Sequence, residues 1–322
     1  MNIVITGAHG FVGQALTKRL LAGAGPREWR DLTRLTLVDL DFAATVSAPA
    51  SHVPDARIRH VSGSIADPAV VKAALEGPVD VVFHLASIPG GAAEKDYALG
   101  RRINLDATLD LLEGLRVQPR PPRVVFASSV AVYGEQLPAR MDEATLPAPA
   151  LTYGAHKLIA EALVADASRL GWIDGCSLRL PGVVARPPGP SGLMSAFMSE
   201  LFWALRDGRA IELPVSEHAV AWWISVGRCA ENLLHAATLD SHALNARRSY
   251  AMPVLRLTMA EVVEALARRF GAPRRALVSY RPDARIERLF GAYPPFDTPH
   301  ALAIGLRHDG DADALVEHAL AG

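Results

Sequence analysis

The chain has 322 residues, half of them hydrophobic, and its 33 basic residues nearly balance its 34 acidic ones. A chain of this length buries about three-quarters of its unfolded surface, so we expect a globular protein. Because the two signs of charge are interspersed and nearly cancel, the sequence argues against nucleic acid or an anionic membrane surface as a partner.

Redox state and location are indicated by the cysteines and the first residues. Cys176 and Cys229 stand in apolar stretches without metal-ligand spacing, so we expect buried, reduced thiols and no metal site. A strand predicted from residue 2 leaves no room for a signal peptide, and no apolar run approaches the length of a membrane span. The expected location is therefore the cytoplasm.

The first predicted elements are a strand, a glycine-rich turn and a helix. Apolar residues 2–5 predict the strand, residues 6–13 read TGAHGFVG, and an amphipathic helix is predicted over Phe11–Leu21. At such a helix start, backbone N–H groups and the helix dipole favour a phosphate, and glycines let the phosphate come close. A purely structural turn is the alternative. The cofactor-binding candidates in this turn are Gly7, Gly10, Phe11, Val12 and Gly13.

Strand-like and helix-like segments then alternate through the first half of the chain. This alternation predicts right-handed strand–helix–strand units, and hence a doubly wound α/β domain with a parallel sheet, the Rossmann arrangement. Strands are predicted at residues 2–5, 35–38, 58–61, 79–85, 124–127 and 176–180, and helices at 11–21, 68–75, 97–115 and 153–170.

The alternation ends at a cluster of prolines, where a smaller C-terminal substrate lobe is expected to begin. Further helices are predicted at 194–206, after a strand edge within 222–239, and at 258–270, where Thr258 and Glu261 form a capping box. The prolines of the cluster are Pro181, Pro187, Pro188 and Pro190. The predicted NAD-binding Rossmann domain comprises residues 1–180 and about 216–248, and the substrate lobe comprises about 181–215 and 249–322.

The choice of cofactor is indicated by Asp39, which ends the second predicted strand. An acid there accepts hydrogen bonds from the adenosine ribose and repels a 2′-phosphate, and no arginine or lysine occurs at 40–47, so NAD is favoured over NADP. A strand-end acid without this role is the alternative. Ser64 and Ile65 are placed to flank an adenine, although the following Asp67 has an equal reading as a simple helix cap.

Three residues predict a hydride-transfer site. Oxidising an alcohol requires a base, and a tyrosine serves as one if its pKa falls from about 10 towards neutrality. Tyr153 and Lys157 are four residues apart on one predicted helix face, so the lysine supplies a cation beside the phenol. Ser129, at the end of the fifth predicted strand, is placed to hydrogen-bond the substrate oxygen.

The ordered set of motifs resembles the extended short-chain dehydrogenase/reductase family, which includes nucleotide-sugar epimerases and dehydratases. The resemblance implies that Ser129 donates to the substrate oxygen, that Tyr153 is the acid/base and that Lys157 is its electrostatic partner. It also implies a homodimer paired through helices 97–115 and 153–170. The residues that carry the resemblance over roughly the first 190 positions are Gly7, Gly10, Gly13, Asp39, His84-Leu85-Ala86, Asn104, residues 128–134, Tyr153, Lys157 and Arg179-Leu180-Pro181. The further cofactor contacts expected are Leu85, Ala86, Ser87, Asn104, Tyr153, Lys157, Pro181 and Val183.

Departures from the family pattern narrow the reaction. Dehydratases of the family carry an acidic pair where this chain has Val130 and Ala131, so dehydration is disfavoured. Nucleotide-sugar enzymes carry a diphosphate-binding arginine where this chain has Val220-Ala221, so a nucleotide-sugar substrate is disfavoured too. Arg186, Arg209 and Arg281 are candidates to replace that arginine.

A subgroup, the D-erythronate dehydrogenases, has a closer resemblance, and its members oxidise a four-carbon sugar acid at the 2-hydroxyl. A small acid needs one cation for its carboxylate and a few hydroxyl partners, for which Arg186 and Ser87 are candidates. A solvated loop position is the alternative for Arg186. Val220 and Pro89 depart from the subgroup. The similar stretches are residues 84–88, 90–94, 171–175, 179–181, 186–187, 230–236 and 296–297.

Four other conspicuous side chains have structural interpretations or none. His84 is expected to pack against the sheet, and Trp222 and Trp223 are expected to pack in the core and at the lobe interface. His156 lies between Tyr153 and Lys157 in sequence but points off their helix face, so no role is assigned to it.

The sequence as a whole predicts an NAD-dependent enzyme that oxidises the 2-hydroxyl of a small sugar acid, such as D-erythronate, to the 2-oxo acid. Tyr153 is the expected base, and Ser87, Ser129, Tyr153 and Arg186 are the expected substrate contacts. The alternative enzyme is a nucleotide-sugar epimerase that retains its NAD. A non-catalytic NAD-binding protein is a third reading, against which the complete set Ser129, Tyr153 and Lys157 argues.

Overall fold

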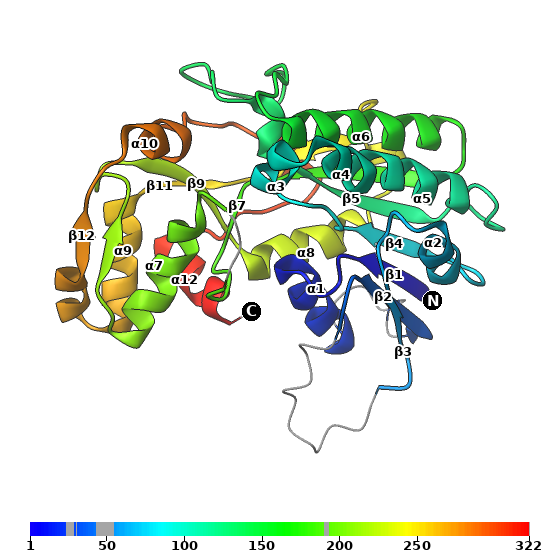
Figure 1. Ribbon diagram of the computed structural model, residues 1–322, viewed down its shortest axis with the longest axis horizontal. Coiled ribbons are helices and arrows are strands. Elements are labelled where there is room, and N and C mark those ends of the chain that lie inside the picture. The colour runs from blue at the N-terminus through cyan, green and yellow to red at the C-terminus, as the bar shows by residue number, and fades with distance from the viewer. Residues whose placement is uncertain (24–28, 30, 43–54, 190–192, 322) are drawn as a thin grey trace.

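A seven-stranded parallel sheet forms the centre of the larger lobe (Figure 1). The computed structural model describes residues 1–23, 29, 31–42, 55–189 and 193–321. Pro190 and positions 43–47, which entered the sequence predictions, lie outside the described residues. In the order β10-β6-β5-β4-β1-β2-β3, the strands are Ser249–Ala251, Asp174–Leu180, Arg123–Ser129, Val81–His84, Asn2–Thr6, Arg34–Asp39 and Ile58–Ser62.

Helices cover both faces of this sheet, because successive side chains of each strand point to opposite faces. Ile3 and Ile5 of β1 pack into one hydrophobic cluster with residues of α1 (Phe11–Leu21) and α8 (Val226–Ala236). Val4 packs into a second cluster on the opposite face. That cluster includes residues of α2 (Pro68–Ala74), α5 (Ala107–Leu115) and α6 (Thr152–Arg169). The predicted doubly wound α/β fold is confirmed.

The helix predicted over 97–115 is interrupted. The structure has α3 (Gly90–Lys95), α4 (Tyr97–Arg101), a π-helical turn (Arg102–Asp106) and then α5. Single π turns widen a helix locally and are frequent at functional sites. Here the turn contains Asn104, whose buried side chain bonds a loop of the site, as described below.

The smaller lobe lies at the left of Figure 1 and combines short sheets with helices. Its three-stranded sheet has the order β11-β9-β7, and β8 pairs with β12. The predicted capping box at the start of α9 is confirmed, with Thr258 and Glu261 bonding each other's backbone. The strands are β7 (Gly182–Val184), β8 (Ile211–Leu213), β9 (Val220–Ser225), β11 (Leu255–Thr258) and β12 (Val278–Tyr280). The helices are α7 (Ala196–Asp207), α9 (Met259–Phe270), α10 (Ala284–Phe290) and α12 (Ala312–Leu320). Between α10 and α12, α11 (Pro299–Ala303) packs through Ala301 into the cluster of the central sheet.

Strand pairing differs from the predicted division of the chain at two strands. β9 was placed with the Rossmann domain, within 216–248, but it pairs with β7 and β11 of the other sheet. β10 begins one residue beyond that segment and is the seventh strand of the central sheet, beside β6. The reason is packing: Trp223 of β9 belongs to the hydrophobic cluster of the smaller lobe, whereas Tyr250 of β10 belongs to a cluster of the central sheet.

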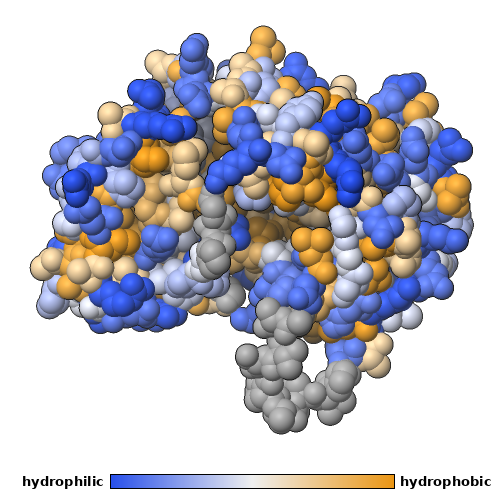
Figure 2. Space-filling model, viewed as in Figure 1, coloured by the Kyte–Doolittle hydropathy of each residue, from blue (hydrophilic) through white to orange (hydrophobic). Residues whose placement is uncertain are grey.

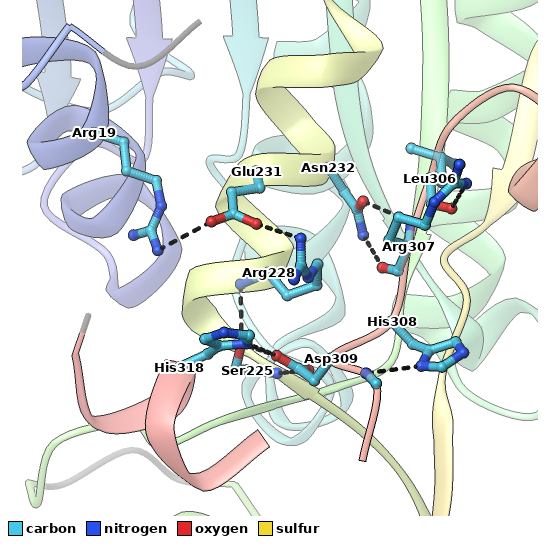
Figure 3. Close-up of polar contacts among 11 residues, drawn as sticks. Arg19, Ser225, Arg228, Glu231, Asn232, Leu306, Arg307, His308, Asp309 and His318 are labelled. Atoms are coloured by element: carbon cyan, nitrogen blue, oxygen red, sulfur yellow. Dashed lines mark hydrogen bonds and ion pairs between the residues drawn. The ribbon is translucent and has the colours of Figure 1, made fainter. Parts of the chain in front are cut away.

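The C-terminal segment is held against α8 by buried polar contacts (Figure 3). Asp309 accepts hydrogen bonds from the backbone and hydroxyl of Ser225, at 2.8 and 2.5 Å, and contacts His318 Nδ1 at 2.9 Å. The Asn232 amide bonds both backbone groups of Arg307. The contacts with Ser225 and Asn232 join residues 84 and 75 positions apart, which explains why the tail is the part of the sequence hardest to interpret.

Both cysteines are free and buried, as expected. Burial raises the pKa of the Cys176 thiol to about 12, which leaves it protonated and unreactive. Among the described helices, none combines the length and the apolar character needed to cross a bilayer.

Candidate active site

The glycine-rich turn between β1 and α1 has room only for glycine at two positions. Gly7 has φ +71°, and a Cβ there would lie 2.8 Å from the Ala86 nitrogen. A Cβ on Gly13 would lie 2.2 Å from the Gly7 oxygen. Gly10 is the N-cap of α1, and no side chain caps this helix start. The turn therefore presents a helix N-terminus with backbone alone, which fits the diphosphate of a dinucleotide.

Asp39 lies beside this turn, at the carboxyl end of β2. Its Oδ2 accepts a hydrogen bond from the His9 backbone at 2.8 Å, and its Oδ1 accepts one from the Leu40 backbone at 2.7 Å. An acid held in this way at the second strand of a Rossmann unit is placed to accept bonds from an adenosine ribose.

The side chains of Ser64, Ile65 and Asp67 each have a structural role in the loop between β3 and α2. The Ser64 hydroxyl accepts from the Ala66 backbone, and Ile65 is buried in the hydrophobic cluster of the α2 face. Asp67 accepts from the Ala69 backbone at 2.9 Å and is the N-cap of α2, as its helix-cap reading predicts.

An open cleft of about 760 Å³ runs from the glycine-rich turn towards α7. Figure 2 shows the surface hollowed between the two lobes. The lining of the cleft brings together most of the predicted site residues: Gly7, Gly10, Phe11, Val12, Gly13, Leu85, Ser87, Ser129, Tyr153, Lys157, Pro181, Val183 and Arg186. Five predicted cofactor contacts lie outside the lining: Asp39, Ser64, Ile65, Ala86 and Asn104.

Tyr153 meets two serine hydroxyls at the floor of this cleft. Its phenol hydrogen-bonds the side chains of Ser129, from the end of β5, and Ser87, from the loop after β4. Burial raises the pKa of Tyr153, and the two hydrogen bonds only partly oppose this. The direction is opposite to the fall expected from the sequence, because desolvation of the phenolate outweighs the stabilisation offered by its neighbours.

Lys157 shares the helix face of Tyr153, as predicted, but its ammonium forms a hydrogen bond with a backbone carbonyl of the protein. The side chain is buried, and Nζ donates to the Ala127 carbonyl at 2.7 Å. Nζ lies 4.7 Å from the centroid of the Phe126 ring and 5.6 Å from that of Tyr153. Burial lowers the pKa of Lys157 to about 7, against the opposing effect of the Glu161 carboxylate. Its charge therefore changes near neutral pH.

A buried ion pair fixes α6, the helix of Tyr153 and Lys157, to the central sheet, and the sequence alone does not predict it. Glu161 of α6 receives two hydrogen bonds from Arg179 of β6, at 2.9 and 2.7 Å, and one from the Ser128 hydroxyl at 2.5 Å. Arg179 also donates to the Tyr133 hydroxyl at 2.8 Å. The spacing of four residues between Lys157 and Glu161 indicates that the two side chains share a helix face. It gives no indication of Arg179, which pairs with Glu161 from a strand 18 residues further along the chain.

A second overlooked residue caps α6 from outside. The N-cap of this helix, Leu151, has no side chain able to bond the first N–H groups. Glu94 of α3 supplies the bond instead, accepting from the Thr152 backbone at 2.5 Å, next to Tyr153. A carboxylate at a helix N-terminus also interacts favourably with the dipole.

Asn104 and His84 support the loop after β4. The Asn104 side-chain amide forms hydrogen bonds with the backbone N–H and C=O of Ile88, at 2.8 and 3.1 Å, and so holds the loop that carries Ser87. Asn104 itself lies outside the cleft lining. His84 lies between the hydroxyls of Thr6 and Thr108, at 2.7 and 2.9 Å. Burial and the nearby Lys157 charge lower the pKa of His84 to about 3, so it is neutral and structural, as expected.

The remaining conspicuous side chains are packed as expected. Trp222 donates to the Pro294 carbonyl at 2.8 Å and stacks on Tyr293 with ring centroids 4.5 Å apart. Trp223 is fully buried in the cluster of the smaller lobe. His156 is buried beside the ring of Tyr97 and lies outside the cleft lining.

Comparisons with known proteins agree with this architecture. A sequence model of the NAD dependent epimerase/dehydratase family matches residues 3–249. The chain is 38% identical over 320 residues to the D-erythronate dehydrogenase of Cupriavidus necator, covering 98% of this chain and 97% of that one. It is 30% identical over 318 residues to the D-erythronate dehydrogenase of Haemophilus influenzae, covering 98% of both. The crystal structure of a nucleoside-diphosphate-sugar epimerase from Agrobacterium tumefaciens matches with a TM-score of 0.88 at 33% identity, covering 98% of this chain and 92% of that one.

The doubly wound sheet and its glycine-rich turn define a Rossmann enzyme that uses a nicotinamide cofactor. The chain belongs to the NAD dependent epimerase/dehydratase family, which is the extended short-chain dehydrogenase/reductase family that its motifs resemble. With two dehydrogenases among its full-length relatives, it is a dehydrogenase of that family.

Proposed function

We propose that the enzyme oxidises the 2-hydroxyl of a small sugar acid, such as D-erythronate, to the 2-oxo acid, with NAD as the acceptor. The observation that carries the proposal is the junction of Tyr153 with Ser129 and Ser87 in the cleft that begins at the glycine-rich turn. Two relatives, at 38% and 30% identity over nearly the whole chain, are D-erythronate dehydrogenases, and this supports the choice of acid.

The chain's own residues supply orientation and proton transfer. The hydroxyls of Ser129 and Ser87 orient the substrate oxygen, and the phenolate form of Tyr153 takes the hydroxyl proton and becomes the neutral phenol. Lys157 lies on the same helix face and stabilises the phenolate when its ammonium is charged. Bound NAD supplies the hydride acceptor. Ser87, Ser129 and Tyr153 are thus the proposed substrate contacts.

The carboxylate of the acid needs a cation, and the sequence assigns it Arg186. In the structure, Arg186 lines the cleft with its guanidinium carbon 5.0 Å from the centroid of the Phe11 ring. Phe11 is the first residue of α1, and the start of α1 is the candidate site for the cofactor diphosphate. The guanidinium of Arg186 therefore has two possible anionic partners, the carboxylate of the acid and the diphosphate of the cofactor.

For the cofactor, we predict that Asp39→Ala narrows the preference for NAD over NADP by about 10-fold, because a charge-assisted bond to the ribose and a repulsion of the 2′-phosphate are both lost. The measurement is kcat/KM with each cofactor. Replacement of Asp110, an exposed acid of α5, is the control and leaves the preference unchanged. An unaltered preference in Asp39→Ala would remove the ribose role.

We further propose a homodimer paired through α4, α5 and α6. These helices lie together on one side of the larger lobe (Figure 1), and apolar side chains reach the surface there. The exposed apolar residues are Tyr97, Leu99, Leu109 and Ile159, which are 38 to 61% exposed. Sedimentation equilibrium is expected to give twice the chain mass, and Ile159→Glu is expected to shift the protein towards the monomer; a monomeric native protein would contradict the pairing.

An NAD-retaining epimerase is the second candidate, and one observation favours it: the likeness to the Agrobacterium tumefaciens structure titled as a nucleoside-diphosphate-sugar epimerase. Against it, Val220 and Ala221 stand where a diphosphate-binding arginine is expected. Both belong to β9, which is paired on both sides by β7 and β11.

The position of oxidation is tested with D-erythronate that carries deuterium at carbon 2. We expect a primary isotope effect on single-turnover oxidation and transfer of the deuterium to NADH. Label that stays in the acid product while NADH forms would show that a different hydroxyl is oxidised.

A further inference from the structure

The backbone of Arg186 is tied to the smaller lobe. Its N–H donates to the Ser199 hydroxyl at 3.0 Å, and its carbonyl accepts from Trp203 Nε1 at 2.5 Å. Ser199 and Trp203 are one turn apart on α7, so both backbone groups of Arg186 are held by one helix face. The residue is therefore fixed in place, unlike a solvated loop position.

The side chain of Arg186 extends in the opposite direction, to the larger lobe. Its guanidinium carbon stands 5.0 Å from the centroid of the Phe11 ring, in cation–π contact. Phe11 follows Gly10, the N-cap of α1 that lacks a side-chain cap. The guanidinium thus lies beside the first side chain of α1, the helix whose start carries no side-chain cap.

The charge of Arg186 has no acidic partner in the part of the chain that the structure describes. No ion pair there involves Arg186, although burial lowers its pKa and so indicates partial desolvation. A partly desolvated cation without a counter-charge is unfavourable, and an anionic ligand removes the cost. Among the described residues that line the cleft, Arg186 and Lys157 are the arginine and the lysine. The ammonium of Lys157 donates to the Ala127 carbonyl.

We propose that Arg186 binds the diphosphate of the dinucleotide and is therefore a cofactor residue of the smaller lobe, not the partner of the substrate carboxylate. The α1 N-terminus offers N–H groups and a partial positive charge, and the planar guanidinium adds the full charge and bidentate donors that a diphosphate accepts. This assignment rests on the nicotinamide chemistry of the proposed function but not on the identity of the acid.

The test measures binding without catalysis. Titration calorimetry compares ADP-ribose, which contains the diphosphate, with adenosine, which does not. In Arg186→Met the dissociation constant of ADP-ribose is expected to rise about 10- to 100-fold, with adenosine unchanged. Arg186→Lys keeps the charge without the planar fork, so an intermediate value is expected.

The matched control is Arg268→Met, because Arg268 of α9 is an exposed arginine of the same lobe that pairs with Asp313 and lies outside the cleft lining. This control is expected to bind ADP-ribose like the native protein. Thermal melts without ligand establish that each variant is folded, and Arg186→Lys carries the test if Arg186→Met does not fold.

Unchanged ADP-ribose affinity in a folded Arg186 variant would overturn the proposal. If the KM of the acid rose at saturating NAD at the same time, Arg186 would be the carboxylate partner. If no acid were oxidised, the proposed reaction would be wrong, but the effect of Arg186 on ADP-ribose affinity would still be measurable. The proposed function and the proposed role of Arg186 are therefore tested independently.

Discussion

Tyr153→Phe is expected to lower kcat about 100-fold or more, because the variant keeps the ring but loses the group that takes the substrate proton. Affinity for NADH, measured by fluorescence titration, is expected to stay nearly unchanged, since the contacts that hold the glycine-rich turn and Asp39 do not involve the lost hydroxyl.

Tyr280→Phe is the matched control, because Tyr280 of β12 lies outside the cleft lining and outside the proposed dimer surface and loses the same single atom. Its turnover is expected to equal that of the native enzyme. If Tyr153→Phe also retained native turnover, Tyr153 would have no part in the proton transfer.

Glu161→Gln is expected to destabilise the protein by about 3–5 kcal/mol, because it leaves the Arg179 guanidinium buried without its counter-charge. The two side chains are only 5 and 7% exposed, so solvent does not screen the loss. Chemical denaturation gives the free energy of unfolding. Because the pair joins α6 to β6 next to Lys157, the folded fraction is also expected to show reduced turnover.

The exposed pair of Glu264 and Arg275 provides the control, with side chains 43 and 46% exposed. Glu264→Gln is expected to cost less than about 1 kcal/mol. In the double variant Glu161→Leu with Arg179→Met both charges are gone, so part of the stability is expected to return. Equal, small losses for Glu161→Gln and Glu264→Gln would show that the buried pair contributes little.

The central fold was predictable because its signals are local. Each strand of the parallel sheet is a short run rich in apolar residues, and Gly7, Gly10 and Gly13 mark the turn between β1 and α1. Tyr153 and Lys157 share a helix face because of their spacing alone, and the structure places them with Ser129 in one cleft.

What escaped prediction depends on long-range packing. The π-helical turn around Asn104 has no local signature, and the partner of its amide, Ile88, is 16 residues away. The sheet to which β9 belongs depends on strands about 30 to 40 residues away on either side. The pKa of Tyr153 was predicted in the wrong direction because spacing reveals the nearby cation but not the desolvation that outweighs it.

Formation of NADH from a panel of acids tests the central claim most directly. Purified enzyme and NAD are mixed with four- to six-carbon aldonic acids, including D-erythronate, and with UDP-sugars, and absorbance follows NADH while chromatography follows the sugars. We predict NADH in proportion to acid consumed, with D-erythronate or a close relative as the best substrate and no change in any UDP-sugar. Interconversion of UDP-sugar isomers without free NADH, together with no oxidation of any acid, would contradict the account and establish the epimerase.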